Sequence, residues 1–304
     1  MKTGRLVYSH RRFNAMGSPC EIKLYAKSRA RAEHMIQRVM AEVERLESLY
    51  SRYRPNSWLS VVNRIAASGG SVTVDDEAAG LLNYVEACHR ESDGLFDITS
   101  GVLREAWKFN GDGLPDPNRI AALLDRVGWH RLRWEFPVLS FPQPGLELDF
   151  GGAVKEYAVD RVAALCWQAE IHHGLVNLGG DIKIIGPHPD GTPWAIGIQH
   201  PRRPGEFIHT LHLRQGAMAS SGDYERCIQV DGRRYGHVLN PRSGWPVGYL
   251  ASVSVVADFC VVAGSASTIA MLKEADGPEW LKAQGVPHFW VDVEGRTGEE
   301  CLGQ

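Results

Sequence analysis

The chain has 304 residues, 44% of them hydrophobic and 23% charged, which is ordinary for a globular protein with a sizeable buried core. Its formal net charge of −3 excludes the strongly basic composition that is typical of nucleic-acid-binding proteins. The six cysteines are scattered at spacings that fit neither a zinc site nor a disulfide framework, so we expect reduced thiols.

The chain also lacks the usual signals for membranes and export. No apolar run approaches the about 18 residues that a membrane-spanning helix needs. The first 17 residues contain neither the apolar core of a signal peptide nor a lipobox-like cysteine. We therefore expect a cytoplasmic protein without a membrane span.

The first half of the chain is predicted to be mainly helical. After an alternating strand at 20–26, apolar residues recur every three or four positions over 28–49, which predicts an amphipathic helix with Ser28 as its N-cap. Further helical segments are expected at 57–66, at 76–91 with a stop at Asp93-Gly94, at 98–107 and at 118–127. The segment 110–118, rich in proline and glycine, is expected to be a surface loop.

The second half mixes strands and helices. Strands are predicted at 132–136, 138–141, 146–150, 175–178, 182–185, 194–199, 208–213, 226–230, 253–256 and 288–293, and helices at 153–168, 263–273 and 278–284. Because the strands look antiparallel and no βαβ unit repeats, we expect an α+β fold. Without a low-complexity linker, residues 1–304 are expected to form one compact unit, and a division into two lobes stays open.

The segment 149–160 (DFGGAVKEYAVD) combines a strand end, a double glycine and a helix start. Gly151 and Gly152 leave room for a ligand, free N–H groups of a first helical turn favour anions, and Lys155 adds a positive charge. A strand-to-helix turn that needs glycine only for its backbone dihedrals explains the same pattern.

Two shorter motifs have equally simple structural explanations. Asn177–Asp181 (NLGGD) fits a tight hairpin turn between two strands. Residues 92–99 (SDGLFDIT) place an aromatic ring between two carboxylates, and helix capping by Asp97 or Thr99 explains the pattern as well as a ligand contact does.

The segment 220–244 holds a Ser-Ser-Gly-Asp turn, a hairpin with its turn at Asp231-Gly232, and the sequence HVLNP at its far end. A hairpin does not need Asp223 and His237 at its two ends, so this tract is typical of a site carried on loops. A histidine with a purely structural role is the alternative. No H-E-x-x-H, P-loop, dinucleotide-binding or nucleophile-elbow motif occurs, so none of these sites is expected.

The order of these motifs resembles that of the FAD:protein FMN transferases, the ApbE-like flavin transferases. The similar blocks are residues 15–18 (AMGS), 51–53 (SRY), Ser57 to Asn63, 94–99 (GLFDIT), 148–155 (LDFGGAVK), 176–181 (VNLGGD), 220–224 (SSGDY), 237–244 (HVLNPRSG) and 252–255 (SVSV). They extend over nearly the whole chain, from residue 15 to about residue 272.

The resemblance implies an ApbE-like α+β domain related to the T-fold. It also implies a reaction in which FAD is cleaved with the help of Mg²⁺. AMP leaves, and FMN is attached through its phosphate to a threonine or serine of an acceptor flavoprotein. This fits phosphoryl transfer, where positioning and charge neutralisation supply most of the catalysis.

The resemblance also implies roles for individual residues. Lys155, Asp223 and His237 would be catalytic, with Lys155 near the pyrophosphate. Lys155 and His237 would also contact the nucleotide, together with Met16, Tyr53, Leu95, Phe96, Asp97, Gly151, Gly152, Ser221 and Gly222.

The expected metal site departs from the family pattern. Family members carry an Ala-Asp-Ala-x-x-Thr segment whose Asp and Thr bind Mg²⁺, whereas this chain has Gly264 and Thr268 there. Thr268 and the carbonyl of Val154 remain as ligands, and the loss of the carboxylate is expected to weaken magnesium binding. Glu156, where the family has glycine, is expected to supply the missing charge. Asn240 likewise replaces the commoner aspartate.

Two alternatives to FMN transfer remain open from the sequence. One is an FAD-binding protein of the same fold without transferase activity. The other is an FAD pyrophosphatase, which would use water as the acceptor and release FMN and AMP.

Overall fold

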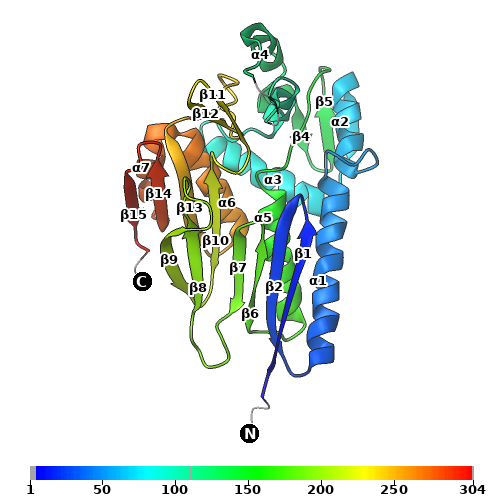
Figure 1. Cartoon of the computed structure of the whole chain (residues 1–304). Helices are drawn as coiled ribbons and strands as arrows, with labels where there is room; N and C mark the ends of the chain where they lie inside the picture. Colours follow the sequence, from blue (N-terminus) through cyan, green and yellow to red (C-terminus); the bar gives the residue numbers. More distant parts are fainter. Residues whose placement is uncertain (1–4, 110, 112, 303–304) are drawn as a thin grey trace.

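An eight-stranded antiparallel sheet forms the centre of the computed structural model, which describes residues 5–109, 111 and 113–302. The strand order is β1-β2-β6-β7-β10-β13-β14-β15, so strands from both ends of the chain share one sheet (Figure 1). The bounds are β1 Val7–Ala15, β2 Ser18–Ala26, β6 Gly174–Leu178, β7 Asp181–Gly186, β10 Ala217–Gly222, β13 Leu250–Ala257, β14 His288–Asp292 and β15 Thr297–Glu300. This arrangement confirms the expected α+β fold with antiparallel strands.

Three helices cover one face of this sheet: α1 (Arg29–Tyr50), α5 (Val154–Gln168) and α6 (Cys260–Leu272) (Figure 1). Ser28 caps α1 as predicted, because its side chain accepts a hydrogen bond from the backbone N–H of Arg31. Most of α6 is buried, and its small residues let it pack closely on both α5 and β10. Helix α6 begins three residues earlier than the sequence predicts.

The remaining elements lie around the sheet. They are α2 (Trp58–Ser68), β3 (Gly70–Thr73), α3 (Asp76–Glu91), the 3-10 segments Ile98–Glu105, Trp129–Arg131 and Glu274–Asp276, α4 (Pro117–Leu124), β4 (Arg133–Glu135), β5 (Val138–Phe141), β8 (Trp194–Gln199), β9 (Phe207–Leu213), β11 (Cys227–Val230), β12 (Arg233–Gly236) and α7 (Gly277–Ala283). The hairpin β11–β12, α4 and the small sheet β3-β5-β4 gather at the same end of the molecule as the β1–β2 turn (Figure 1).

Two sequence predictions are wrong for identifiable reasons. Residues 146–150 do not form a strand, because the side-chain amide of Asn63 takes both backbone groups of Leu148, at 2.8 and 2.9 Å. The expected turn at Ser220–Gly222 is instead the end of β10, which pairs with β13. In the predicted loop 110–118, residues 110 and 112 lie outside the described residues, and α4 already begins at Pro117.

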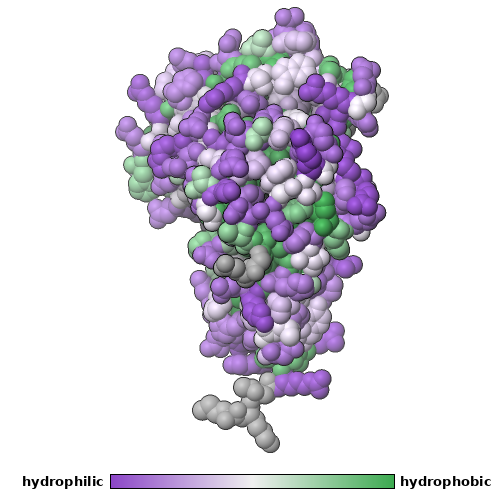
Figure 2. Space-filling model, turned by 90° about the vertical axis from the view of Figure 1, so that its left-hand side faces the viewer, coloured by the Kyte–Doolittle hydropathy of each residue, from purple (hydrophilic) through white to green (hydrophobic). Residues whose placement is uncertain are grey.

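The outer edge of the sheet is polar. Strand β15 is short, and its sequence TGEE places two carboxylates on the edge, which is a common protection against strand pairing between molecules. Figure 2 shows a mainly hydrophilic surface on this side, with hydrophobic side chains collected around the middle. In the described part of the chain, no helix combines the length and the apolar character needed to cross a membrane.

Candidate active site

The first turn of α5 meets the β1–β2 and β6–β7 turns at one end of the sheet. Gly179, with a φ of 63°, lies in the β6–β7 turn, where the sequence predicts a hairpin. A Cβ at this position would lie 2.7 Å from Cβ of Ser18 and 3.5 Å from Nζ of Lys155. A glycine here therefore lets β2, the hairpin turn and Lys155 approach one another closely.

Lys155 pairs with one buried carboxylate and directly precedes another in the sequence. Its Nζ is 2.8 Å from Oδ2 of Asp181 on β7, and the next residue on α5 is Glu156. Burial lowers the pKa of Lys155, but the charges of Asp181 and Glu156 outweigh this effect and raise it above its usual value. Lys155 is therefore a fully charged cation at the start of a helix, and its charge is already partly neutralised by Asp181.

Glu156 is the second carboxylate of this group, and only 7% of its surface is exposed. Burial raises the pKa of Glu156, and the charge of Asp181 raises it further. Its side chain faces Gly264 of α6, where a Cβ would lie 2.5 Å from Cγ of Glu156. Val154, the first residue of α5, is buried two positions earlier.

One hydroxyl group of β10 and two of α6 lie close together. The Oγ of Ser221 is 2.8 Å from Oγ of Ser267 and 3.0 Å from Oγ1 of Thr268. Thr268 is one helical turn after Gly264, so both residues lie on the same face of α6. In the described residues, no three His, Cys, Asp or Glu side chains cluster as metal ligands, so a cation here would also need hydroxyl or carbonyl oxygens.

Asp223 follows β10 and is held by an ion pair. Arg202, in the connection between β8 and β9, donates to both carboxylate oxygens of Asp223, at 2.6 and 2.7 Å. The backbone N–H of Asp223 also donates to the carbonyl of Ala251 on β13. Because Arg202 engages both oxygens, the geometry favours a positioning role for Asp223 over proton transfer.

His237 follows β12 directly, one residue after a close contact between Gly236 and Asp223. At the preceding residue, Gly236, a Cβ would lie 2.9 Å from Cα of Asp223, so only glycine permits this close approach. The Nδ1 of His237 is buried without a hydrogen-bond partner among the described residues. Burial lowers the pKa of His237, so its imidazole is neutral near pH 7 and able to accept a proton.

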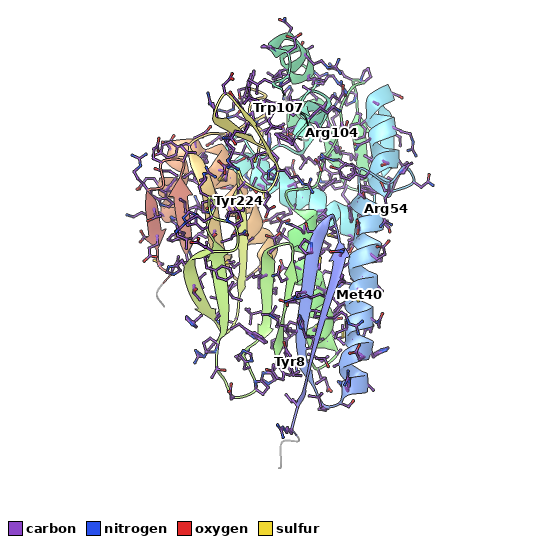
Figure 3. The ribbon with its side chains drawn as sticks, in the orientation of Figure 1. Tyr8, Met40, Arg54, Arg104, Trp107 and Tyr224 are labelled. Atoms are coloured by element: carbon purple, nitrogen blue, oxygen red, sulfur yellow. The ribbon has the colours of Figure 1, made fainter. Side chains whose placement is uncertain are left out.

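Trp107 anchors the loop that follows His237. Its buried indole N–H donates to the carbonyl of Gly244 at 2.8 Å. The Trp107 ring also lies 6.1 Å from the Tyr235 ring and 5.3 Å from the Trp245 ring, between ring centroids. Figure 3 places Trp107, Arg104 and Tyr224 at the same end of the molecule.

Tyr53 is an exposed aromatic residue held by the arginine before it. The side chain of Arg52 donates to the Tyr53 hydroxyl at 2.8 Å and also pairs with the carboxylate of Asp149. Partial burial raises the pKa of Tyr53, but this hydrogen bond and the nearby positive charges lower it overall. With 70% of its surface exposed, the Tyr53 ring is free to stack on a flat ligand.

Met16 lies in the two-residue turn between β1 and β2, with a φ of 51°. Arg226, in the loop after β10, reaches this turn, since its Nη2 lies 3.5 Å from the place of a Cβ at Gly17. The β10–β11 loop, which carries Arg226, and the Met16 turn therefore lie close together.

Phe96, between Leu95 and Asp97 in the sequence, lies against the double-glycine turn. A Cβ at Gly152 would lie 3.3 Å from the ring of the buried Phe96. The carboxylate of Asp97 accepts hydrogen bonds from the backbone N–H of Thr99 at 2.8 Å and from that of Trp129 at 3.0 Å. The capping explanation of this motif is therefore confirmed for Asp97.

Comparison with known proteins gives the family. The family model described as ApbE matches residues 16–290 of the chain. The chain belongs to the ApbE family. The FAD:protein FMN transferase of Klebsiella pneumoniae (strain 342) is 33% identical over 247 residues, which cover 79% of this chain and 75% of the relative.

Solved structures of ApbE proteins have the same fold. The ApbE protein of Thermotoga maritima MSB8 superposes with a TM-score of 0.89 at 27% identity over 97% of both chains. The apo form of Pseudomonas stutzeri flavinyl transferase ApbE gives a TM-score of 0.85 at 28% identity, over 99% of this chain and 97% of that one. The expected ApbE-like fold is thus confirmed.

The sequence interpretation assigned no role to three charged residues of the candidate site. Asp181 was read only as part of a hairpin turn, although it is the ion-pair partner of Lys155. Arg202, the partner of Asp223, lies in a loop with no motif of its own, and Arg52, the partner of Asp149, lies in the SRY block without having been assigned a role. A buried acidic residue after a double glycine was the one available signal, since buried carboxylates are usually paired.

Proposed function

We propose that the chain is an FAD:protein FMN transferase. The hydroxyl oxygen of a threonine or serine on an acceptor protein forms a bond to the FMN phosphorus of FAD. The bond between that phosphorus and the bridging oxygen breaks, and AMP leaves with the bridging oxygen. The observation that carries this proposal is Lys155, a charged amine at the start of α5, in a chain whose relatives are named FAD:protein FMN transferases.

The roles of the side chains follow from their surroundings. Lys155 offsets the charge that develops on the pyrophosphate, and neutral His237 accepts the proton of the acceptor hydroxyl. Asp223, held by Arg202, positions the β10–β11 loop and His237. The nucleotide is held by the tyrosine ring, the double-glycine turn and the wall at the end of β10: Met16, Tyr53, Leu95, Phe96, Asp97, Gly151, Gly152, Ser221 and Gly222.

A divalent cation, Mg²⁺ in this proposal, fits the oxygen atoms next to Lys155. Glu156 has a buried Oε2 without a hydrogen-bond partner among the described residues, and Thr268 adds a hydroxyl. Together with the carbonyl of Val154, these are the hard oxygen ligands that Mg²⁺ prefers. When bound, the cation would neutralise charge on the pyrophosphate during transfer.

The direct test follows AMP release from FAD. The pure protein is mixed with FAD and Mg²⁺, with and without a folded acceptor flavoprotein that carries the target threonine. AMP release that requires the acceptor, together with covalent FMN on it, supports transfer. Release at the same rate without the acceptor indicates a pyrophosphatase, and tight FAD binding without AMP release indicates a binding protein. Either of these two results would overturn the proposal.

Tyr53→Ala is expected to weaken FAD binding by about tenfold or more, because stacking on an aromatic ring is worth roughly 1–3 kcal/mol. The free energy of unfolding should change little, since the Tyr53 ring is exposed. Quenching of flavin fluorescence on binding measures the affinity.

Tyr8→Ala is the matched control for this experiment. Tyr8 is also exposed, at 46%, and lies at the opposite end of β1 from the candidate site (Figure 3). We expect its FAD affinity to equal that of the unmodified protein. If FAD affinity falls equally in both variants, Tyr53 is not part of the flavin site.

Three further points stay predictions of the sequence: the cytoplasmic location, the absence of a nucleic-acid partner, and the single domain over residues 1–304.

A further inference from the structure

Glu156 carries a buried carboxylate that no protein group fully satisfies. Its residue is 7% exposed, and Oε2 has no hydrogen-bond partner in the part of the chain that the structure describes. Most buried polar atoms are paired, because an unpaired one loses its hydration without compensation. An unpaired carboxylate oxygen is therefore a place where a cation or a proton can bind.

The charges around Glu156 favour the same two partners. Glu156 and Asp181 are both nearly fully buried, while Lys155 is the cation that pairs with Asp181 at 2.8 Å. If both carboxylates are ionised, one ammonium leaves an excess negative charge in a buried site. A bound divalent cation compensates this excess, and a proton on one carboxylate is the alternative when no cation is present.

Position 264 of α6 determines whether Glu156 has room. A Cβ there would lie 2.5 Å from Cγ, 2.9 Å from Cδ and 2.9 Å from Oε1 of Glu156. These distances are too short for any side chain, so the glycine at 264 is what allows the Glu156 carboxylate to occupy this space. A side chain at 264 would itself enter the same space, one turn before Thr268.

We propose that Glu156 and Gly264 form an exchanged pair, in which α5 supplies the cation-binding carboxylate and α6 supplies the space for it. The proposal rests on the proposed function only for the use of the cation in catalysis. A carboxylate at position 156 of α5 or at position 264 of α6 can occupy this space, provided that the other of these two positions is a glycine. Cation binding can be tested separately from the reaction.

The test measures Mn²⁺ binding to the full chain without FAD, by isothermal titration calorimetry and by the electron paramagnetic resonance signal of free Mn²⁺. Mn²⁺ takes the same hard oxygen ligands as Mg²⁺ and is visible to the spectrometer. We expect about one site per chain in the unmodified protein. Glu156→Gln keeps the shape of the side chain and should lower the affinity by about tenfold or more.

Asp160→Asn is the matched control, since Asp160 is another carboxylate of α5. It accepts hydrogen bonds from the backbone N–H groups of Cys260 and Val261, both at 2.9 Å, and so has its partners already. We expect Mn²⁺ affinity to stay unchanged in this variant. Equal loss in Asp160→Asn and Glu156→Gln would overturn the assignment of the carboxylate to Glu156.

A double variant tests the exchange itself. Glu156→Gly should lose Mn²⁺ affinity as Glu156→Gln does, and Glu156→Gly combined with Gly264→Asp should regain it to within about tenfold of the unmodified protein. A double variant that binds no better than Glu156→Gly would overturn the exchange, as would an unmodified protein that binds no Mn²⁺. Circular dichroism checks that each variant is folded.

The failure of this inference differs from a failure of the proposed function. If Mn²⁺ binds with an affinity that depends on Glu156 but no FMN is transferred, the exchanged pair is supported and the proposed transferase function is wrong. If FMN is transferred at the same rate by Glu156→Gln and by the unmodified protein, and Mn²⁺ affinity is also unchanged, the function stands and the exchange is wrong.

Discussion

Lys155→Met is expected to lower the rate of FMN transfer by about a thousandfold, the upper range for the loss of one group that stabilises developing charge. The same substitution is expected to cost roughly 3 kcal/mol of stability. It leaves Asp181 buried without its ion-pair partner, and breaking a buried pair from one side is strongly destabilising. Single-turnover measurement of AMP release and urea denaturation separate the two effects.

The double variant Lys155→Met with Asp181→Asn distinguishes catalysis from folding. Removing both charges avoids the unpaired carboxylate, so most of the lost stability should return. The transfer rate should stay low, because no ammonium faces the pyrophosphate. Recovery of the rate together with stability would show that Lys155 acts only by holding the fold.

The long helices could be predicted because their pattern is local. In α1, buried residues recur every three or four positions, and the N-cap Ser28 accepts a hydrogen bond from the backbone N–H of Arg31 in the first helical turn. Strand β1 could not be predicted from alternation, since most of its residues are exposed or half-buried. Strand β10 was missed because AMASSG has small polar residues where a typical strand has branched ones, and its place between β7 and β13 sets its structure.

The candidate site shows the same division. The glycine turn before Lys155 and the histidine after the hairpin are visible as short motifs. The ion pair between Arg202 and Asp223 depends on where two separate loops meet, and no local pattern encodes that meeting. The contact between Glu156 and Gly264 joins two helices distant in sequence. The sequence predicted that Glu156 replaces a lost charge, but only the packing of α5 on α6 gives the reason for the glycine.

Asp223→Asn is expected to cost roughly 3 kcal/mol of stability and to lower FMN transfer with it. The amide presents an N–H group to the Arg202 guanidinium and so breaks an ion pair of two hydrogen bonds, in which Asp223 is only 5% exposed as a residue. We expect the β10–β11 loop, and His237 next to Gly236, which contacts Asp223, to lose their fixed position as a result. Urea denaturation measures the stability, and covalent FMN on the acceptor measures the transfer.

The double variant Arg202→Met with Asp223→Leu decides whether Asp223 positions the loop or moves a proton. Replacing a buried ion pair by apolar side chains of similar size is often neutral for stability or favourable. If Asp223 positions His237, the double variant recovers both stability and a large part of the transfer rate. Its rate should also keep the pH profile of the unmodified protein, because His237 remains the proton acceptor. A stable double variant without transfer would instead make Asp223 a catalytic base, in spite of the arginine that engages both of its oxygens.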